Sequence, residues 1–223
     1  MEYIKRNLDI LLNKIEGTGC QLVAVTKTHP IEVLDYTYKL GFKRFGENKV
    51  QEMCDKQVQL PADVDWHLIG HLQSNKVKYA APFTSLIHGV DSFSLLQKIN
   101  KQALKNNRTI NCLLQLHIAQ EETKFGLDES ELKTILDNPA FYELKNIKIK
   151  GLMGMASNTD NQNQVRAEFR GLKTLWDSIK QNYQNERVDI QTLSMGMSGD
   201  YQIAIEEGST LIRVGSAIFG NRG

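Results

Sequence analysis

Lys27 is the residue whose surroundings point most directly to chemistry. It follows an apolar run at 22–26, LVAVT, whose β-branched residues are typical of a buried strand, and Pro30 stands three positions later. Proline suits the first turn of a helix, so Lys27 is expected where a strand ends and a helix begins, which is where α/β folds bind ligands. An amine held partly neutral there can form a Schiff base with an aldehyde. The alternative is a solvated lysine in a strand–helix loop.

Two loops late in the sequence have residue types that suit an anion. They are SMGMSGD at 194–200 and VGSA at 214–217. Glycines allow tight turns that bring N–H groups close to a ligand, serine hydroxyls add donors, and a following helix offers its positive end. Each loop alone also fits a turn and a helix cap. Together they predict a phosphate site after strands seven and eight of a barrel.

Two further polar residues follow predicted strands. Arg213 ends the last of them, and its permanent charge could pair with a phosphate or donate to a ring nitrogen, whereas the alternative is an ion pair with Glu47. Asn48 either caps the next helix or hydrogen-bonds a ligand. His67 and His71 are four apart, but they lie on a strand and then a loop, so they do not share a face. We expect no metal site.

The elements that must position these residues alternate along the whole sequence. Helical spacing of apolar residues predicts a helix over 3–15 before the first strand. The predicted strands are 22–26, 44–45, 66–69, 86–88, 110–118, 149–153, 192–194 and 211–213. The predicted helices are 31–40, 49–57, 75–80, 92–106, 129–137, 162–182 and 198–207, with a short one starting near Ser216. Eight strand–helix units favour a single (β/α)8 TIM barrel with an extra N-terminal helix over an open doubly wound sheet.

Composition narrows the class of protein. The 223 residues are 41% hydrophobic and 24% charged, as in soluble globular proteins, and no linker divides them, so 1–223 is expected to be one domain. A net charge of +1 argues against nucleic acid and anionic membranes as partners. Three cysteines without CxxC spacing fit a reduced, cytoplasmic compartment. No signal peptide and no apolar run near ~18 residues are present, so no membrane span is expected.

Five stretches match a known family in the same order. They are VAVTKTHP, FGENKVQE, WHLIGHLQSNK, GLMGMA and SMGMSGDYQIAIEEGSTLIRVGSAIFG. The chain resembles the pyridoxal 5′-phosphate (PLP) homeostasis proteins, whose fold is similar to the barrel domain of alanine racemase. The match runs from residue 23 nearly to the end, and its last stretch is 27 residues long. The departures are small: His29 stands where many members have lysine.

The resemblance implies a role for each candidate residue. Lys27 would hold PLP as a Schiff base, Arg213 would face the pyridine nitrogen, and Asn48 would lie near the cofactor. Lys124 falls where family members often have a second functional lysine. The residues that would hold the phosphate are Ser194, Gly215 and Ser216, with the loop through Met195 and Ser198.

The same resemblance separates two functions. Racemases of this kind have a β-rich domain after the barrel, whose tyrosine is the second catalytic base, but only ten residues follow Arg213 here. We therefore expect a monomeric carrier that buffers PLP, and delivers it to PLP-dependent apoenzymes, without robust catalytic activity. The alternative is a PLP-dependent racemase or related amino-acid enzyme. A third class, a phosphosugar isomerase without cofactor, would share the phosphate site.

Overall fold

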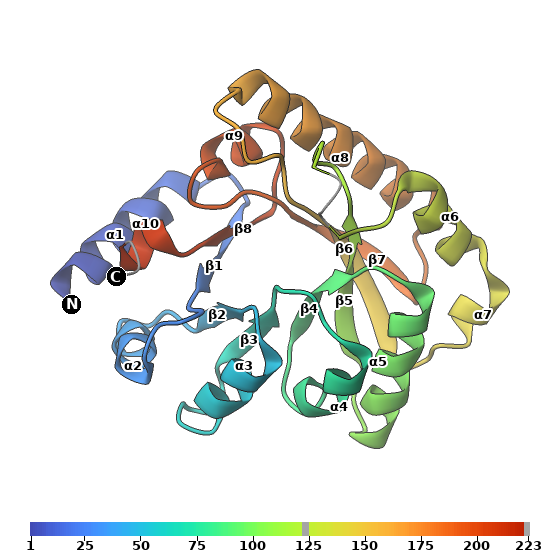
Figure 1. Ribbon diagram of the computed structural model, residues 1–223, viewed down its shortest axis with the longest axis horizontal. Helices are drawn as coiled ribbons and strands as arrows, with labels where there is room; N and C mark the ends of the chain where they lie inside the picture. The colour runs from blue at the N-terminus through green and yellow to red at the C-terminus, as the bar shows by residue number, and fades with distance from the viewer. Residues whose placement is uncertain (122–124, 221–223) are drawn as a thin grey trace.

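Parallel strands close on themselves to form the centre of the molecule. In the computed structural model, which describes residues 1–121 and 125–220, eight strands pair in chain order and β8 returns to β1 (Figure 1). The strands are β1 (Gln21–Val25), β2 (Arg44–Glu47), β3 (Asp65–Leu68), β4 (Leu86–Val90), β5 (Ile110–Leu116), β6 (Ile147–Gly154), β7 (Val188–Ser194) and β8 (Leu211–Val214). The (β/α)8 barrel expected from the alternation of the sequence is therefore confirmed.

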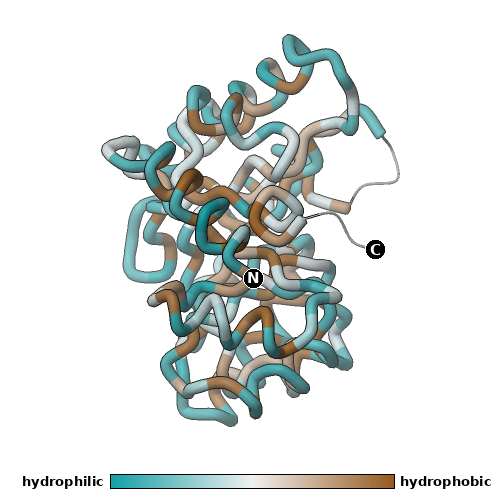
Figure 2. Tube along the Cα trace, turned by 90° about the vertical axis from the view of Figure 1, so that its left-hand side faces the viewer, coloured by the Kyte–Doolittle hydropathy of each residue, from teal (hydrophilic) through white to brown (hydrophobic). Residues whose placement is uncertain are grey.

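Helices surround the barrel and cover its outer face with apolar residues. They are α1 (Glu2–Ile15), α2 (Ile31–Lys39), α3 (Val50–Gln57), α4 (Val77–Ala80), α5 (Phe93–Lys105), α6 (Glu129–Asp137), α7 (Pro139–Tyr142), α8 (Gln162–Tyr183), α9 (Tyr201–Glu206) and α10 (Ser216–Phe219), with a 3-10 turn at Ser74–Lys76. Hydrophobic and hydrophilic segments alternate along them (Figure 2), as amphipathic helices require. Among the described residues, none of the helices combines the length and apolar character needed to cross a membrane.

The N-terminal helix lies beside the last one. Tyr3 and Asn7 of α1 donate hydrogen bonds to the carbonyl oxygens of Phe219 and Ile218, at 3.2 and 3.1 Å. Helices α1 and α10 therefore lie side by side on the same side of the barrel (Figure 1). This contact accounts for the extra helix that the sequence predicted before the first strand.

Several elements differ from the sequence-based expectation in their bounds or in their presence. The helix expected from residue 198 begins at Tyr201, because the Asp200 side chain accepts a hydrogen bond from the Met197 N–H, at 2.5 Å, and folds 197–200 into a turn. The short helix α7 was not expected; Pro139 occupies its first turn and Asn138 caps it. β5 also ends at Leu116, two residues before the predicted end.

The inside of the barrel has an apolar layer beneath a polar one. Val23, Leu86, Leu113, Met153 and Leu211 form a buried cluster separate from the larger core between sheet and helices. Because side chains alternate along a strand, the residue two positions after each of these also points inward, nearer the carboxyl ends. Four of those positions line the site described next: Val25, Gln115, Met155 and Arg213.

Candidate functional site

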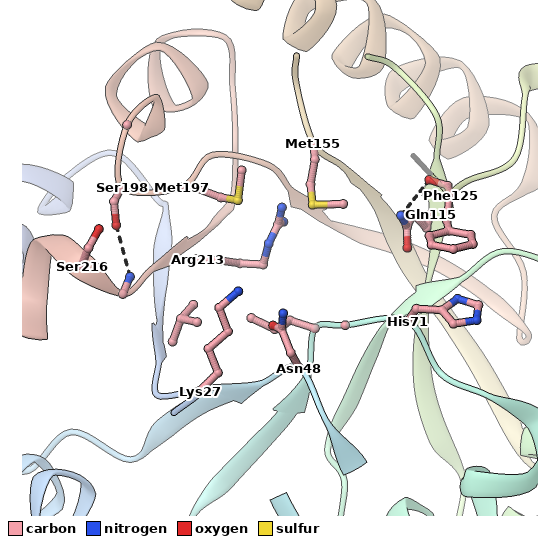
Figure 3. Close-up of a pocket in the computed structure, with 15 residues that line it drawn as sticks. Lys27, Asn48, His71, Gln115, Phe125, Met155, Met197, Ser198, Arg213 and Ser216 are labelled. Atoms are coloured by element: carbon pink, nitrogen blue, oxygen red, sulfur yellow. Dashed lines mark hydrogen bonds between the residues drawn. The ribbon is translucent and has the colours of Figure 1, made fainter. Parts of the chain in front are cut away.

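A cavity of about 420 Å³ opens at the carboxyl ends of the strands. This is the end of a (β/α)8 barrel at which ligands bind. Six of the eight site residues that the sequence suggested line this one cavity (Figure 3). They are Lys27, Asn48, Ser198, Arg213, Gly215 and Ser216.

Lys27 follows β1 directly and points its amine into the cavity. Its side chain extends toward Arg213 and Asn48 (Figure 3). The next residue, Thr28, has a φ of 67°, a left-handed conformation that is uncommon for a residue with a side chain. The Thr28 N–H donates a hydrogen bond of 2.5 Å to Oε1 of Glu52 on α3, which stabilises this turn. The backbone immediately after Lys27 is therefore held in place by α3.

A buried ion-pair cluster fixes the backbone before Lys27. The Lys56 amine donates to the carbonyl oxygen of Thr26 at 2.8 Å, to Oε1 of Glu47 at 2.7 Å and to Oε1 of Glu52 at 2.6 Å. Glu47 is fully buried, and burial raises its pKa although the hydrogen bonds from Lys56 and Thr26 oppose the rise. Glu47 thus forms its ion pair with Lys56. The ion pair between Glu47 and Arg213, which the sequence left open as an alternative, is not the one that forms. Sequence reasoning missed Lys56, although its i,i+4 spacing from Glu52 was visible.

The loops after β7 and β8 are tied together by one hydroxyl. Ser198 Oγ accepts a hydrogen bond of 3.3 Å from the N–H group of Gly215 (Figure 3) and another of 3.3 Å from that of Ala217. Gly215 also lies close to β1, since a Cβ there would be 3.0 Å from the Val25 carbonyl oxygen. An oxyanion placed at these amides would meet the same N–H donors that Ser198 engages, together with the Ser216 hydroxyl group. The arrangement suits a phosphate group.

Arg213 is a buried cation at the floor of the cavity. Its side chain is 3% exposed, and it donates to Ser194 Oγ at 2.6 Å and to the Gly154 carbonyl oxygen at 3.1 Å. Burial lowers its pKa to about 10, which leaves the guanidinium charged at neutral pH. Two of its five N–H groups are engaged by these oxygens, and the guanidinium also borders the cavity.

The opposite wall of the cavity contains an aromatic pair. The rings of His71 and Phe125 stack with 4.6 Å between centroids and 20° between planes. Gln115 donates from Nε2 to the Phe125 carbonyl oxygen at 2.8 Å, which joins β5 to this segment. Gly70 permits the close approach of the loop after β2, because a Cβ there would lie 2.3 Å from the Asn48 carbonyl oxygen. Sequence reasoning missed this wall; the polar Gln115 within an apolar strand was its clearest signal.

Comparison with known proteins identifies the relatives of this barrel. A family model described as alanine racemase, N-terminal domain, matches residues 1–223. The pyridoxal phosphate homeostasis protein of Aquifex aeolicus (strain VF5) is 41% identical over 208 residues, which cover 92% of this chain and 89% of that protein. The protein of the same name from Schizosaccharomyces pombe is 36% identical and covers 100% of this chain and 94% of its own. The chain belongs to the pyridoxal phosphate homeostasis protein family.

Solved structures agree with this family and with the fold. PipY of Synechococcus elongatus PCC7942, in a structure with PLP bound, is 34% identical with a TM-score of 0.88, covering 97% of this chain and 100% of that one. The structure of PipY without PLP is 35% identical in sequence to this chain, with a TM-score of 0.90. Alanine racemase of Clostridium difficile 630 is 13% identical with a TM-score of 0.79, and the match spans 57% of that chain. The last likeness concerns the fold alone.

Three residues that the family resemblance suggested lie elsewhere or outside the described part. Ser194 is fully buried beneath Arg213 and does not line the cavity. Met195 is fully buried in the core between sheet and helices, because its side chain points to the outer face of the barrel. Lys124 lies outside the described residues. Within the described residues there is no group of three acidic, cysteine or histidine side chains that could hold a metal ion.

Proposed function

We propose that this chain binds PLP in the cavity at the carboxyl ends of its strands and takes part in PLP homeostasis. The names of its relatives and the PLP-bound structure of PipY support this function. The observation that carries the proposal is the convergence of Lys27, Arg213 and the Ser198–Gly215 contact on one cavity. We propose further that residues 1–223 act as one PLP-binding domain.

The residues present fit the three functional parts of this cofactor. PLP has an aldehyde, a ring nitrogen and a phosphate dianion, and when bound it supplies an electrophilic carbon to an amine. Lys27 provides the amine, and Arg213 provides a donor for the ring nitrogen. The amides and hydroxyls near Gly215 and Ser198 provide the phosphate contacts, and Asn48 lies beside Lys27 (Figure 3). No other residue of the described cavity lining offers a lysine amine.

Lys27 is proposed to bind the aldehyde covalently. Its neutral Nζ attacks the carbonyl carbon, a carbon–nitrogen double bond replaces the carbon–oxygen bond, and one water molecule leaves. This step is reversible, so a protein that forms it can also release the intact aldehyde. Reversible capture is what buffering of a reactive aldehyde requires.

Arg213 is proposed to favour binding over amino-acid catalysis. A guanidinium donates a hydrogen bond to the ring nitrogen but does not protonate it, because it keeps its own proton at neutral pH. An unprotonated ring withdraws electrons less effectively, so carbanion chemistry at a bound amino acid is disfavoured. The relatives are named homeostasis proteins rather than enzymes, which supports a carrier without robust activity.

The proposed carrier is a monomer that passes PLP to PLP-dependent apoenzymes in the cytoplasm. Cys20, Cys54 and Cys112 are free thiols in the structure, in keeping with a reducing compartment. A racemase or related amino-acid enzyme is the second candidate, and its support is the likeness of fold to alanine racemase.

Borohydride trapping followed by peptide mapping tests the covalent contact. Reduction of the PLP-loaded protein should fix the label on Lys27, and Lys27→Ala should abolish both the label and the visible absorbance band. Lys180→Ala, at an exposed position of α8, should leave both unchanged. A label on another lysine, or none, would contradict the role of Lys27.

An activity assay separates the two candidates. Alanine racemisation by the PLP-loaded protein should not exceed a control without protein. A turnover of a few per second that disappears in Lys27→Ala would favour the enzyme, because typical enzymes turn over about 10 times per second.

A further inference from the structure

A line of hydrogen-bonded side chains crosses the barrel interior beneath Arg213. Arg213 donates to Ser194 Oγ at 2.6 Å, and Ser194 Oγ lies 3.1 Å from His88 Nδ1. His88 Nε2 lies 2.9 Å from His67 Nδ1, and His67 Nε2 lies 3.3 Å from Asp65 Oδ1. We call these five residues the interior network. Its side chains come from β8, β7, β4 and β3.

The interior network connects the two ends of the barrel. Ser194, His88, His67 and Arg213 are at most 5% exposed. Asp65 begins β3 at the amino ends of the strands, and its side chain is 32% exposed. There Arg44 of β2, its register partner, donates from Nε to Asp65 Oδ2 at 2.7 Å. The interior network therefore starts at the ligand cavity and ends at the opposite mouth of the barrel.

When both imidazole rings are neutral, the two charged ends fix the direction of every hydrogen bond between them. Arginine can only donate and a carboxylate can only accept. Asp65 therefore requires the proton of His67 on Nε2, which leaves His67 Nδ1 as an acceptor for Nε2–H of His88. His88 Nδ1 then accepts from the Ser194 hydroxyl, whose oxygen accepts from Arg213. A single arrangement satisfies all five groups, and both rings in it are neutral.

The charges around the two rings favour this neutral state. Burial lowers the pKa of His88 well below its usual value, and His67, Arg213 and Arg44 act in the same direction while Asp65 opposes them. Burial also lowers the pKa of His67, although the contact with Asp65 opposes the shift and Arg44 adds to it. For Asp65, burial acts to raise the pKa, but the hydrogen bonds from His67, Arg44 and Ser85 outweigh it and the pKa falls.

We propose that Ser194, His88 and His67 are positioning residues that orient the Arg213 guanidinium toward the cavity through one fixed hydrogen-bond arrangement anchored at Asp65. The role rests on the proposed contact between Arg213 and the ring nitrogen of PLP. A buried guanidinium on a flexible stem needs fixed acceptors to hold one orientation, and Ser194 Oγ and the Gly154 carbonyl oxygen provide two. Removing the Ser194 hydroxyl breaks this arrangement where it meets Arg213.

Nitrogen NMR of the ligand-free protein tests the hydrogen-bond arrangement itself. Long-range correlations in the imidazole rings distinguish the two tautomers and the charged form, and His67→Gln and His88→Gln assign the signals. Both rings should be neutral with the proton on Nε2 between about pH 6 and pH 8. A proton on Nδ1 of either ring, or a charged ring in this range, would overturn the proposal without involving PLP.

A pair of ligands tests the effect on Arg213. The probes are PLP and its carbocyclic analogue, in which a CH group replaces the ring nitrogen. The wild-type chain should bind PLP more tightly, and Ser194→Ala should reduce this preference by roughly tenfold, the size expected for one hydrogen bond to a charged group. Thr84→Val, which removes a buried hydroxyl that bonds to Ala80, should keep the wild-type preference.

The outcomes separate the positioning role from the proposed function. A preference for PLP that is unchanged in Ser194→Ala overturns the positioning role alone. Equal affinities of the wild-type chain for both probes overturn the contact between Arg213 and the ring nitrogen, and the positioning role with it. A general loss of fold would lower both affinities and leave their ratio unchanged. The preference is therefore judged on Ser194→Ala protein whose affinity for the carbocyclic analogue stays at the wild-type level.

Discussion

Lys56 donates a hydrogen bond of 2.8 Å to the carbonyl oxygen of Thr26, the residue immediately before Lys27. The same amine contacts Glu47 and Glu52, and Glu52 accepts from the N–H of Thr28. The backbone on both sides of Lys27 is thus attached to α3. An amine that must meet an aldehyde gains from this attachment, because a fixed backbone limits the positions that the side chain can sample.

Lys56→Met should destabilise the protein in a pH-dependent way. Removing one partner of a buried pair costs about 3–5 kcal/mol, and here it leaves the Glu47 carboxylate without its cation. The pKa of Glu47 is already raised, so stability linked to its protonation is present at low pH and is lost as pH rises through the folded-state pKa. In urea unfolding, the free energy of unfolding of Lys56→Met should therefore fall further below that of the wild-type chain near pH 8 than near pH 5.

Glu47→Gln in the same background is the matched control for that cluster. A neutral amide needs no cation, so the double variant should lose most of the pH dependence. An equal loss of stability for Lys56→Met at both pH values would show that Glu47 is not the group concerned.

Gly151→Ala and Gly171→Ala should have opposite effects on stability. Gly151 in β6 has a φ of 154°, and a Cβ there would lie 1.7 Å from the Thr192 carbonyl oxygen, so its substitution should cost more than about 3 kcal/mol. Gly171 is exposed in α8 with nothing within 4 Å of a Cβ, so alanine should add about 0.5–1 kcal/mol. Thermal unfolding measures both variants. Midpoint temperatures that shift in the same direction for Gly151→Ala and Gly171→Ala would contradict the prediction.

Mild acid should destabilise the protein through His67 and His88. Burial lowers both pKa values, so the unfolded chain binds more protons below about pH 6.5, and stability is lost as pH falls through that window. His88→Gln should reduce the difference in unfolding free energy between about pH 7.5 and pH 5.5. His117→Gln, at an exposed position, should leave this difference unchanged. An equal pH dependence in the wild-type chain, His88→Gln and His117→Gln would refute the assignment to the buried rings.

Phe125→Ala should speed the release of PLP with little effect on folding. The Phe125 ring is 59% exposed, lines the cavity and stacks on His71, so its loss widens the mouth. Release should be several-fold faster when the freed aldehyde is trapped with excess semicarbazide, while stability changes by less than about 0.5 kcal/mol. Tyr79→Ala, an exposed aromatic residue outside the cavity lining, should release PLP at the wild-type rate.

The alternation of apolar runs and helical patterns was enough to predict the barrel, because a parallel strand needs a crossover helix and eight such units close on themselves. Local chemistry set the boundaries that were missed. The side chain of Asp200 turns the chain back on Met197 and delays α9, and this contact could not be read from propensity. Pro139 and Asn138 do start α7, but the element is only four residues long.

The sequence by itself determined which residue types reach the carboxyl ends of the strands: an amine at 27, a guanidinium at 213 and glycine–serine loops after β7 and β8. Only the tertiary structure decided their depth and contacts. Ser194 points into the barrel beneath Arg213, Lys56 reaches back to Thr26, and Phe125 closes a wall against His71. These contacts join residues far apart in sequence, and closure of the barrel brings them together in a way that no local pattern records.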